Sequence, residues 1–544
     1  YIASGNESIL DINLISDFDQ RRPYWTTDPD KKIQTVDISE SGENVVLTSR
    51  GRIFTTPVEG GRWIELTRKS GIRYKSAGFI GKKEEVVFLS DESGEMELWK
   101  TAKNGFSNAE QLTKESKVLI MNYLPSPDGK YIAYTEKDYA LKLCNVEKNT
   151  TKQIDQDNVS GFGNLTWSPD SKWLAYVDPA DNQADQIKVM NIESGKSFHL
   201  TTDRFESYYP AFSTDGNWFY FISDRTFNSL TGSPWGPRQP EPFYFKTGKI
   251  YMLALNDTVR SPFLPYDELN QKPKSTDKKK DDVVKMNPDM EHAMAKMYEA
   301  PVSAENISQL KVTSKYLYWV QRDLEDRSNT KLFALEISNK KDNKPVEISD
   351  KIRGYEISGN GEKILLRKSD GIYVIDANGK KAELKDAKIN LKEWMFQIDP
   401  VEDWKQMMLD AWRLERDYFY DKNMHGVDWD KVLERHLPLV DRLTDRYELD
   451  DVLADMVSEL SALHIFVRGG EKRTTEENVA PASLGARLVK DKNGKGYTIE
   501  HIYNGEPDLP GERSPLSQPQ LKINEGDVIT KINGVNVLDV DNIN

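Results

Sequence analysis

Alternating apolar and polar positions follow a recurring turn along the first three-quarters of the chain. In the clearest copies, at residues 124–134, 167–176 and 212–220, an apolar or aromatic residue comes shortly before an Asp-Gly or Asp-Ser pair, and a strand-like stretch follows. Glycine accepts a positive φ and aspartate caps the turn, so the pattern predicts a tight hairpin that leads into a half-buried strand.

The turn recurs at a regular spacing. Weaker copies at residues 38–47, 79–89, 310–320 and 357–366 bring the glycine-equivalent positions to 42, 83, 129, 171, 216, 314 and 361. Successive positions lie 41–47 residues apart, except for one step of 98 residues. Such a repeat accommodates four short strands, which is one blade of a β-propeller. We therefore expect residues 1–390 to form a propeller of about seven blades, in which the turn and aromatic residues are structural.

The one long step predicts an insertion at residues 225–300. It contains a Pro-rich stretch at 233–240, a strand-like stretch at 249–255 and a charged, turn-rich run at 272–282. We expect the charged run to be a solvated loop, with a lid or docking role as the alternative.

The hydrophobic period becomes helical after residue 395. Asp399 and Pro400 fit an N-cap followed by proline at the first helical position, and apolar residues then recur every three or four positions up to Phe419. Residues 427–434 predict a second helix, residues 449–463 a third, and residues 465–467 a short strand. We expect a small helical domain over residues 395–470.

Three histidines belong to this helical region. His464 ends the third predicted helix, where its charge suits the helix dipole, but imidazole can also act as a general base because its pKa lies near neutrality. His425, in a Met-His-Gly turn, is expected to be a structural connector, and His436 a surface or packing residue. The sequence has no His-Glu-x-x-His spacing, so we predict no metal and no other cofactor.

The last stretch, residues 480–544, resembles a PDZ domain. The resemblance lies in Ile-Asn-Glu-Gly-Asp-Val-Ile at 523–529 and Ile-Asn-Gly at 532–534. Leu484, Gly485 and Ala486 match the loop whose backbone N–H groups hold a peptide's terminal carboxylate, beside which an extended peptide adds a strand. A purely scaffolding role is equally open. We expect the sequence to stop inside this domain and to be part of a longer protein.

The bulk composition argues against several partners. The net charge is −14, with lysine and arginine spread among the acids, and such a surface repels nucleic acids and anionic membranes. No apolar run approaches the about 18 residues of a membrane span. The single cysteine, Cys144, lies in an alternating stretch and is expected to be a buried small hydrophobe.

Three stretches resemble the tricorn protease family: residues 412–421, 424–429 and 459–467, the last of which contains His464. The repeats likewise resemble TolB-like and tricorn-type propellers. The resemblance implies a multidomain, mainly β serine peptidase of the S41 type, in which a propeller, a helical domain, a PDZ domain and a nucleophile domain follow one another. It implies that His464 is the general base for a serine beyond Asn544, so that these residues alone would be inactive.

The resemblance also implies a class of substrate, an oligomeric state and a cellular location. Oligopeptides would be the substrates, the propeller their filter or conduit, and the protein a cytoplasmic homo-oligomer, a hexamer in the family. An exported protein is the alternative if a signal peptide precedes Tyr1. One position departs from the family pattern, because Leu463 replaces a serine next to the histidine and cannot donate a hydrogen bond.

Two other functions compete with a tricorn-like peptidase. The first is a non-catalytic TolB-like propeller with a PDZ domain that binds peptides or protein partners, and Leu463 favours it. The second is a peptidase of the prolyl oligopeptidase type, which would need a Gly-x-Ser-x-Gly motif that the sequence lacks.

Overall fold

A computed structural model describes residues 17–543, without 27, 115, 231–242, 258, 269–285, 287, 324–325, 327, 393, 474–482 and 541–542. The chain divides into two compact units, Tyr1–Arg468 and Gly469–Asn544. The expected propeller and helices therefore belong to one unit and the PDZ-like stretch to another.

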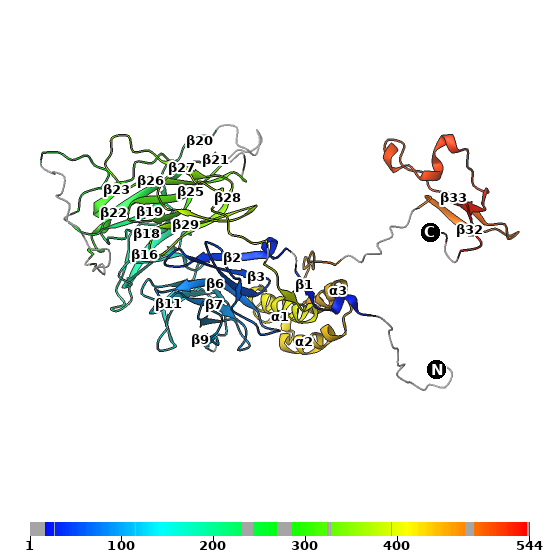
Figure 1. Ribbon diagram of the computed structural model, residues 1–544, viewed down its shortest axis with the longest axis horizontal. Helices are drawn as coiled ribbons and strands as arrows, with labels where there is room; N and C mark the ends of the chain where they lie inside the picture. The colour runs from blue at the N-terminus through cyan, green and yellow to red at the C-terminus, as the bar shows by residue number, and fades with distance from the viewer. Residues whose placement is uncertain are drawn as a thin grey trace. The chain divides into compact units, whose positions relative to one another are not determined.

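Seven consecutive antiparallel sheets of three or four strands are found among the described residues of the first unit (Figure 1). The first three consist of β2 (Ile33–Ile38), β3 (Asn44–Ser49), β4 (Arg52–Pro57) and β5 (Ile64–Glu65); β6 (Tyr74–Ile80), β7 (Glu85–Ser90), β8 (Glu97–Thr101) and β9 (Glu110–Gln111); and β10 (Ile120–Pro125), β11 (Tyr131–Glu136), β12 (Ala140–Asn145) and β13 (Thr150–Gln156). The next two consist of β14 (Gly163–Trp167), β15 (Trp173–Pro179), β16 (Asp185–Asn191) and β17 (Ser197–His199); and β18 (Ser207–Phe212), β19 (Trp218–Asp224), β22 (Gly248–Ala254) and β23 (Met297–Glu299). The last two consist of β24 (Ile307–Val312), β25 (Tyr316–Arg322), β26 (Thr330–Glu336) and β27 (Val346–Ser349); and β28 (Ile352–Ile357), β29 (Lys363–Lys368) and β30 (Gly371–Asp376).

The recurring turn joins the first two strands of a sheet. Between β10 and β11, the Ser126 hydroxyl donates to Asp128 Oδ1 (2.7 Å) and accepts from the Tyr131 N–H (3.0 Å). Gly129 takes a φ of 72° at the tip. The same pairing of a serine with a carboxylate or amide recurs at Ser168–Asp170, Ser213–Asp215 and Ser358–Asn360. These hydrogen bonds explain why the repeat keeps Ser two residues before Asp or Asn.

Hydrophobic clusters join neighbouring sheets, and the last sheet packs on the first. Ile38 and Val45 share one cluster with Leu365 and Ile372, and the Arg367 guanidinium donates to the Gln34 carbonyl (2.9 Å). The prediction of a multidomain, mainly β chain with a propeller is confirmed. The count of seven blades stays a prediction, which this order of sheets supports.

The predicted insertion splits the fifth sheet. β19 pairs directly with β22, although their facing ends, Asp224 and Gly248, lie 24 residues apart in the sequence. A short hairpin of β20 (Ser229–Leu230) and β21 (Phe243–Tyr244) belongs to the intervening stretch. The whole Pro-rich stretch at 233–240 and the whole charged run at 272–282 lie outside the described residues, so their predicted roles stay predictions.

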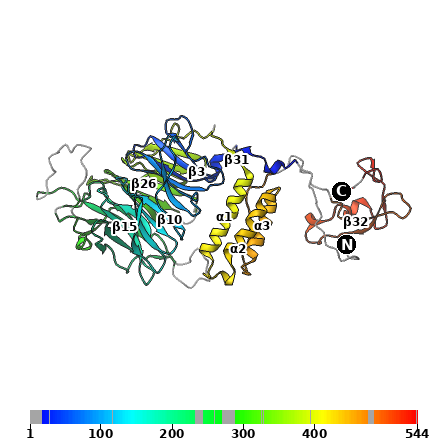
Figure 2. The same cartoon turned by 90° about the horizontal axis from the view of Figure 1, so that it is seen from below.

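Helices α1 (Pro400–Tyr418), α2 (Trp429–His436) and α3 (Arg446–Ser458) form a small bundle beside the strands, as Figures 1 and 2 show. The predicted cap of α1 is confirmed, because Asp399 Oδ1 accepts from the Val401 N–H at 3.1 Å. The predicted end of the third helix at residue 463 is wrong. α3 ends at Ser458, and the left-handed φ of 48° at Ser461 is incompatible with a helix that continues to residue 463. No strand forms at residues 465–467.

The second unit contains a three-stranded antiparallel sheet, in the order β32 (Ala486–Lys490), β33 (Tyr497–Ile502), β34 (Val528–Ile529). A two-stranded hairpin, β35 (Lys531–Ile532) and β36 (Val535–Asn536), follows. Ile499, Ile502 and Leu516 form its small hydrophobic core.

Candidate functional site

His464 lies in an irregular segment after α3, not at a helix end. Its φ is 66°, a left-handed value that costs free energy for any residue with a Cβ. The imidazole is exposed, faces the Phe466 ring with 6.2 Å between centroids, and forms no hydrogen bond with any residue that the structure describes. Leu463, which replaces the family's serine, is 89% exposed. The predicted base is therefore accessible, and an acidic partner for it would have to come from elsewhere.

A mostly apolar groove of about 500 Å³ runs alongside this segment. Its walls come from the end of α1 and from the chain on both sides of His464: Leu414, Glu415, Tyr418, Phe419, Tyr420, Ala462, Leu463 and Ile465. Burial raises the pKa of the Glu415 carboxyl, and within the described part of the chain this side chain has no hydrogen-bonding or ionic partner. The groove is large enough for a side chain or a short segment of peptide.

The other two histidines of the helical region are held in place by hydrogen bonds. His425 Nδ1 donates to the Leu460 carbonyl (2.8 Å), and its Nε2 is hydrogen-bonded to the Tyr420 hydroxyl. His436 is buried, with Nδ1 donating to the Val432 carbonyl at 2.7 Å. These contacts agree with the expected connecting and packing roles.

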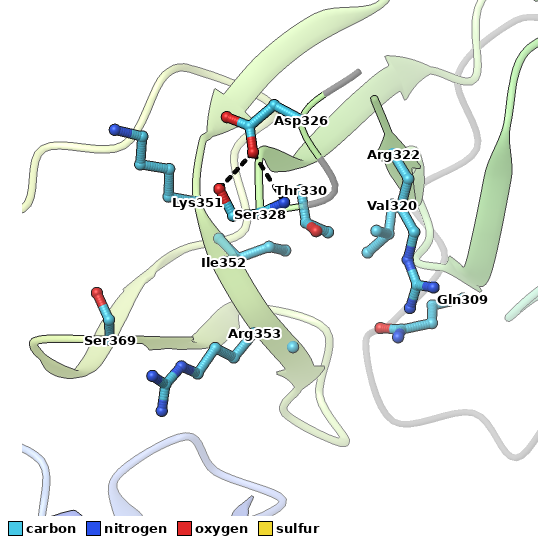
Figure 3. A pocket seen from close by; sticks show the side chains of 11 residues that line it. Gln309, Val320, Arg322, Asp326, Ser328, Thr330, Lys351, Ile352, Arg353 and Ser369 are labelled. Carbon is cyan, nitrogen blue, oxygen red and sulfur yellow. Dashed lines mark hydrogen bonds between the residues drawn. The ribbon is translucent and has the colours of Figure 1, made fainter. Parts of the chain in front are cut away.

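Among the described residues of the propeller, strands line at least two hollows. One, of about 680 Å³, is surrounded by the first strands of several sheets, from β10 to β28. The other, of about 620 Å³, lies between β25 and β28 and presents Arg322, Lys351 and Arg353 (Figure 3). Asp326 also lines this second hollow, and its carboxylate accepts hydrogen bonds from the Ser328 hydroxyl and from the Ser328 N–H (3.0 Å).

In the predicted carboxylate-binding loop of the second unit, some backbone groups already form hydrogen bonds with nearby side chains. The Gly485 N–H donates to the Ser483 hydroxyl (3.1 Å), and the Gly485 carbonyl accepts from the Ser514 hydroxyl (2.8 Å). Ala486 begins β32, which is an edge strand of the sheet and pairs only with β33 among the described residues. The edge is therefore the part of this unit best suited to an added strand.

Within the described residues, no group of three or more His, Cys, Asp or Glu side chains is arranged to hold a metal ion. Searched over the same residues, the chain contains no helix both long and apolar enough to cross a membrane. Cys144 is buried, as predicted.

The sequence did not reveal the groove beside His464. Leu414 and Tyr418 lie in a stretch that resembles the family, but nothing in the one-dimensional pattern brings them to residues 462–465. Glu415 carried the one available signal, because it places an acid on an otherwise apolar helical stripe.

A propeller, a small helical bundle and a small β unit, in this order, define a multidomain, mainly β chain. The chain belongs to the tricorn protease family. The description "Tricorn protease second beta propeller domain" matches residues 33–378, "Tricorn protease C1 domain" residues 400–458, and "Tricorn protease PDZ domain" residues 482–544.

Relatives and a solved structure agree with this assignment. The "Tricorn protease homolog" of Saccharolobus solfataricus is 26% identical over 539 residues, covering 96% of this chain and 47% of the relative. "Tricorn protease homolog 1" of Streptomyces coelicolor is 26% identical over 482 residues, 84% of this chain and 44% of the relative. A crystal structure of the tricorn protease superimposes with a TM-score of 0.71 at 19% identity, over 97% of this chain and 50% of that one. The chain thus spans about half the length of these curated relatives.

Proposed function

We propose that this chain is part of a serine-type peptidase that degrades oligopeptides, with His464 as the general base. The observation that carries the proposal is the unbroken order of the three tricorn domain matches, with His464 six residues after the second. The exposed imidazole, whose chain neighbours Leu463 and Ile465 line an apolar groove, supports it, because a general base must be accessible to the substrate.

The reaction would begin with attack of a serine hydroxyl on the peptide carbonyl. His464 would accept the serine's proton and then deliver it to the leaving amine, and water would hydrolyse the acyl-enzyme. The nucleophilic serine, of the S41 type, would be supplied from outside these 544 residues, which alone would be inactive. Leu463 cannot assist, so any further polarising group would also come from elsewhere.

The other parts would deliver substrate. The hollow bounded by the propeller's inner strands would serve as a filter or conduit for oligopeptides, and the edge of β32 next to Leu484, Gly485 and Ala486 would hold an extended segment. We also propose a cytoplasmic homo-oligomer, on the family resemblance.

The test is hydrolysis of fluorogenic oligopeptides by the full-length natural polypeptide that contains this chain. His464→Ala should lower kcat/KM by about 10²–10⁴, the usual contribution of a general base. His199→Ala is the matched control, because His199 is an exposed histidine of β17 that interacts with Asp178 instead (2.8 Å).

The control should keep full activity, and both variants should keep the native unfolding temperature. Equal rates for His464→Ala and the wild type would overturn the assignment of His464. Absence of hydrolysis in the wild type would instead favour the non-catalytic peptide-binding function.

A further inference from the structure

His425 lies where the ends of two helices meet. It belongs to the short turn Met424–Gly426 between α1 and α2, yet its ring reaches the carbonyl of Leu460, just past the end of α3 (2.8 Å from Nδ1). A carbonyl can only accept a hydrogen bond, so Nδ1 must carry the proton. One imidazole thus ties the end of α3 to a turn 35 residues earlier in the chain.

The opposite edge of the same ring is held by the end of α1. Nε2 is hydrogen-bonded to the Tyr420 hydroxyl, and the rings of Phe419 and Tyr420 contact the imidazole edge-to-face, with 5.0 and 5.3 Å between centroids. His425 is solvent-exposed, yet both ring nitrogens are hydrogen-bonded and two aromatic rings contact the imidazole, and these contacts together favour the orientation seen here.

The segments on either side of the His425–Leu460 hydrogen bond have an uncommon backbone. Met424 and His425 take φ values of 50° and 53°, and Ser461 and His464 take 48° and 66°. Residues with a Cβ keep left-handed φ values only where their surroundings impose them, and such positions cluster at functional sites.

Leu460 is the last firmly buried residue before His464. Its side chain is fully buried in the helical core, whereas Leu463 and His464 are exposed. Ala462 and Ile465, on either side of this exposed pair, pack only partly against the same core. The fully buried Leu460, whose carbonyl His425 binds, is therefore the firm anchor of this segment.

We propose that His425 is a positioning residue for His464. It fixes the turn at residues 460–464 and so holds His464 in the segment whose residues Leu463 and Ile465 line the groove. This inference rests on the proposed function, since it is the general base that His425 would hold in place.

Two variants separate the hydrogen bond from the bulk of the ring. In His425→Asn, the amide nitrogen takes nearly the place of Nδ1 and can still donate to the Leu460 carbonyl, whereas the longer side chain of His425→Gln places its amide near Nε2. In the full-length natural polypeptide, His425→Gln and His425→Ala should lower kcat by roughly 10–100-fold, because a misplacement of about 1 Å costs about that much. KM should stay within about threefold, and His425→Asn should retain most of the activity.

Hydrogen exchange supplies a readout that does not depend on catalysis. The amides of Leu460 and Ser461, which donate to the Val457 and Ser458 carbonyls (3.2 and 2.9 Å), should exchange at least about tenfold faster in His425→Ala and His425→Gln, and near the wild-type rate in His425→Asn. This pattern would support the positioning role even if the wild type cleaved no peptide, an outcome that would count against the proposed function alone. Equal kcat losses in the Asn and Gln variants, or unchanged exchange in all three, would overturn the inference.

Discussion

At the scale of single residues, two glycines of the second unit share a backbone conformation but not an environment. Gly485 has a φ of 66° and Gly494 a φ of 68°. A Cβ at Gly485 would lie 2.2 Å from the Ser514 hydroxyl oxygen, whereas a Cβ at Gly494 would have no neighbour within 4 Å. Both positions need glycine for its left-handed φ, and only Gly485 also needs it for space.

Gly485→Ala should therefore destabilise the second unit more than Gly494→Ala. The backbone term, about 1 kcal/mol, is common to both, and displacing Ser514 with its hydrogen bond should add about 1–2 kcal/mol at Gly485. The measurement is hydrogen exchange of the β32 and β33 amides in the 544-residue chain. Equal acceleration in the two variants would show that Ser514 does not pack against Gly485.

At the scale of elements, helix α1 has two faces that make different kinds of contact. Its apolar residues pack in the helical core, while a row of charged residues meets the turns of the first two sheets. The ion pairs are Asp403–Arg50 (3.1 Å), Asp410–Arg73 (3.0 Å), Arg413–Asp91 (2.8 Å) and Arg416–Glu95 (2.7 Å). The helix that leads towards the groove is thereby fixed to the propeller.

The Arg413–Asp91 pair should contribute most to this attachment. Their side chains are only 10% and 2% exposed, and Arg413 also donates to the Gly94 carbonyl (2.8 Å). Arg413→Ala leaves the Asp91 carboxylate buried without its cation and should cost about 3–5 kcal/mol. Lys405→Ala is the control on the same helix, since the pair of Lys405 with Asp441 (2.8 Å) is more exposed, and it should cost at most about 1 kcal/mol. Urea denaturation of both variants measures the difference; similar losses would contradict the argument.

The sequence predicted the secondary-structure elements better than it predicted the tertiary contacts of those elements. The Ser-x-Asp turns and the Asp399 cap could be predicted because their hydrogen bonds are local. The end of α3 could not, because Leu460 and Leu463 continue the apolar spacing, although Leu460 is fully buried and Leu463 is 89% exposed. The ion-pair partner of Arg413 could not be predicted either, because Asp91 lies 322 residues earlier in the sequence. His464 was identified by resemblance, and its surroundings required the three-dimensional structure.

At the scale of the whole propeller, one carboxyl group on an inner strand is influenced by four sheets. Asp37 of β2 accepts a hydrogen bond from the Phe79 N–H of β6 (2.8 Å). Its carboxylate also interacts electrostatically with Glu356 of β28 and Lys311 of β24. Burial, followed by repulsion from Glu356, raises the Asp37 pKa from 3.8 to about 6, although the Phe79 and Ile38 N–H groups and Lys311 act in the opposite direction.

This raised pKa predicts the direction in which the stability of the folded protein changes with pH. A carboxyl whose pKa is higher in the folded than in the unfolded protein stabilises the fold at acidic pH, and that contribution is lost as pH rises from about 4 through about 6. Each pKa unit corresponds to about 1.4 kcal/mol, so keeping Asp37 ionised in the folded protein at pH 7 should cost on the order of 3 kcal/mol. Asp37→Asn keeps an acceptor for Phe79 without the charge. Its unfolding temperature should match the wild type near pH 4, exceed it increasingly as pH rises through about 6, and then keep a constant lead up to about pH 7.5, whereas the exposed Asp386→Asn should show no such trend. A constant difference across this range would mean that Asp37 is ionised throughout, and that the inner strands accommodate its charge without cost to the ring.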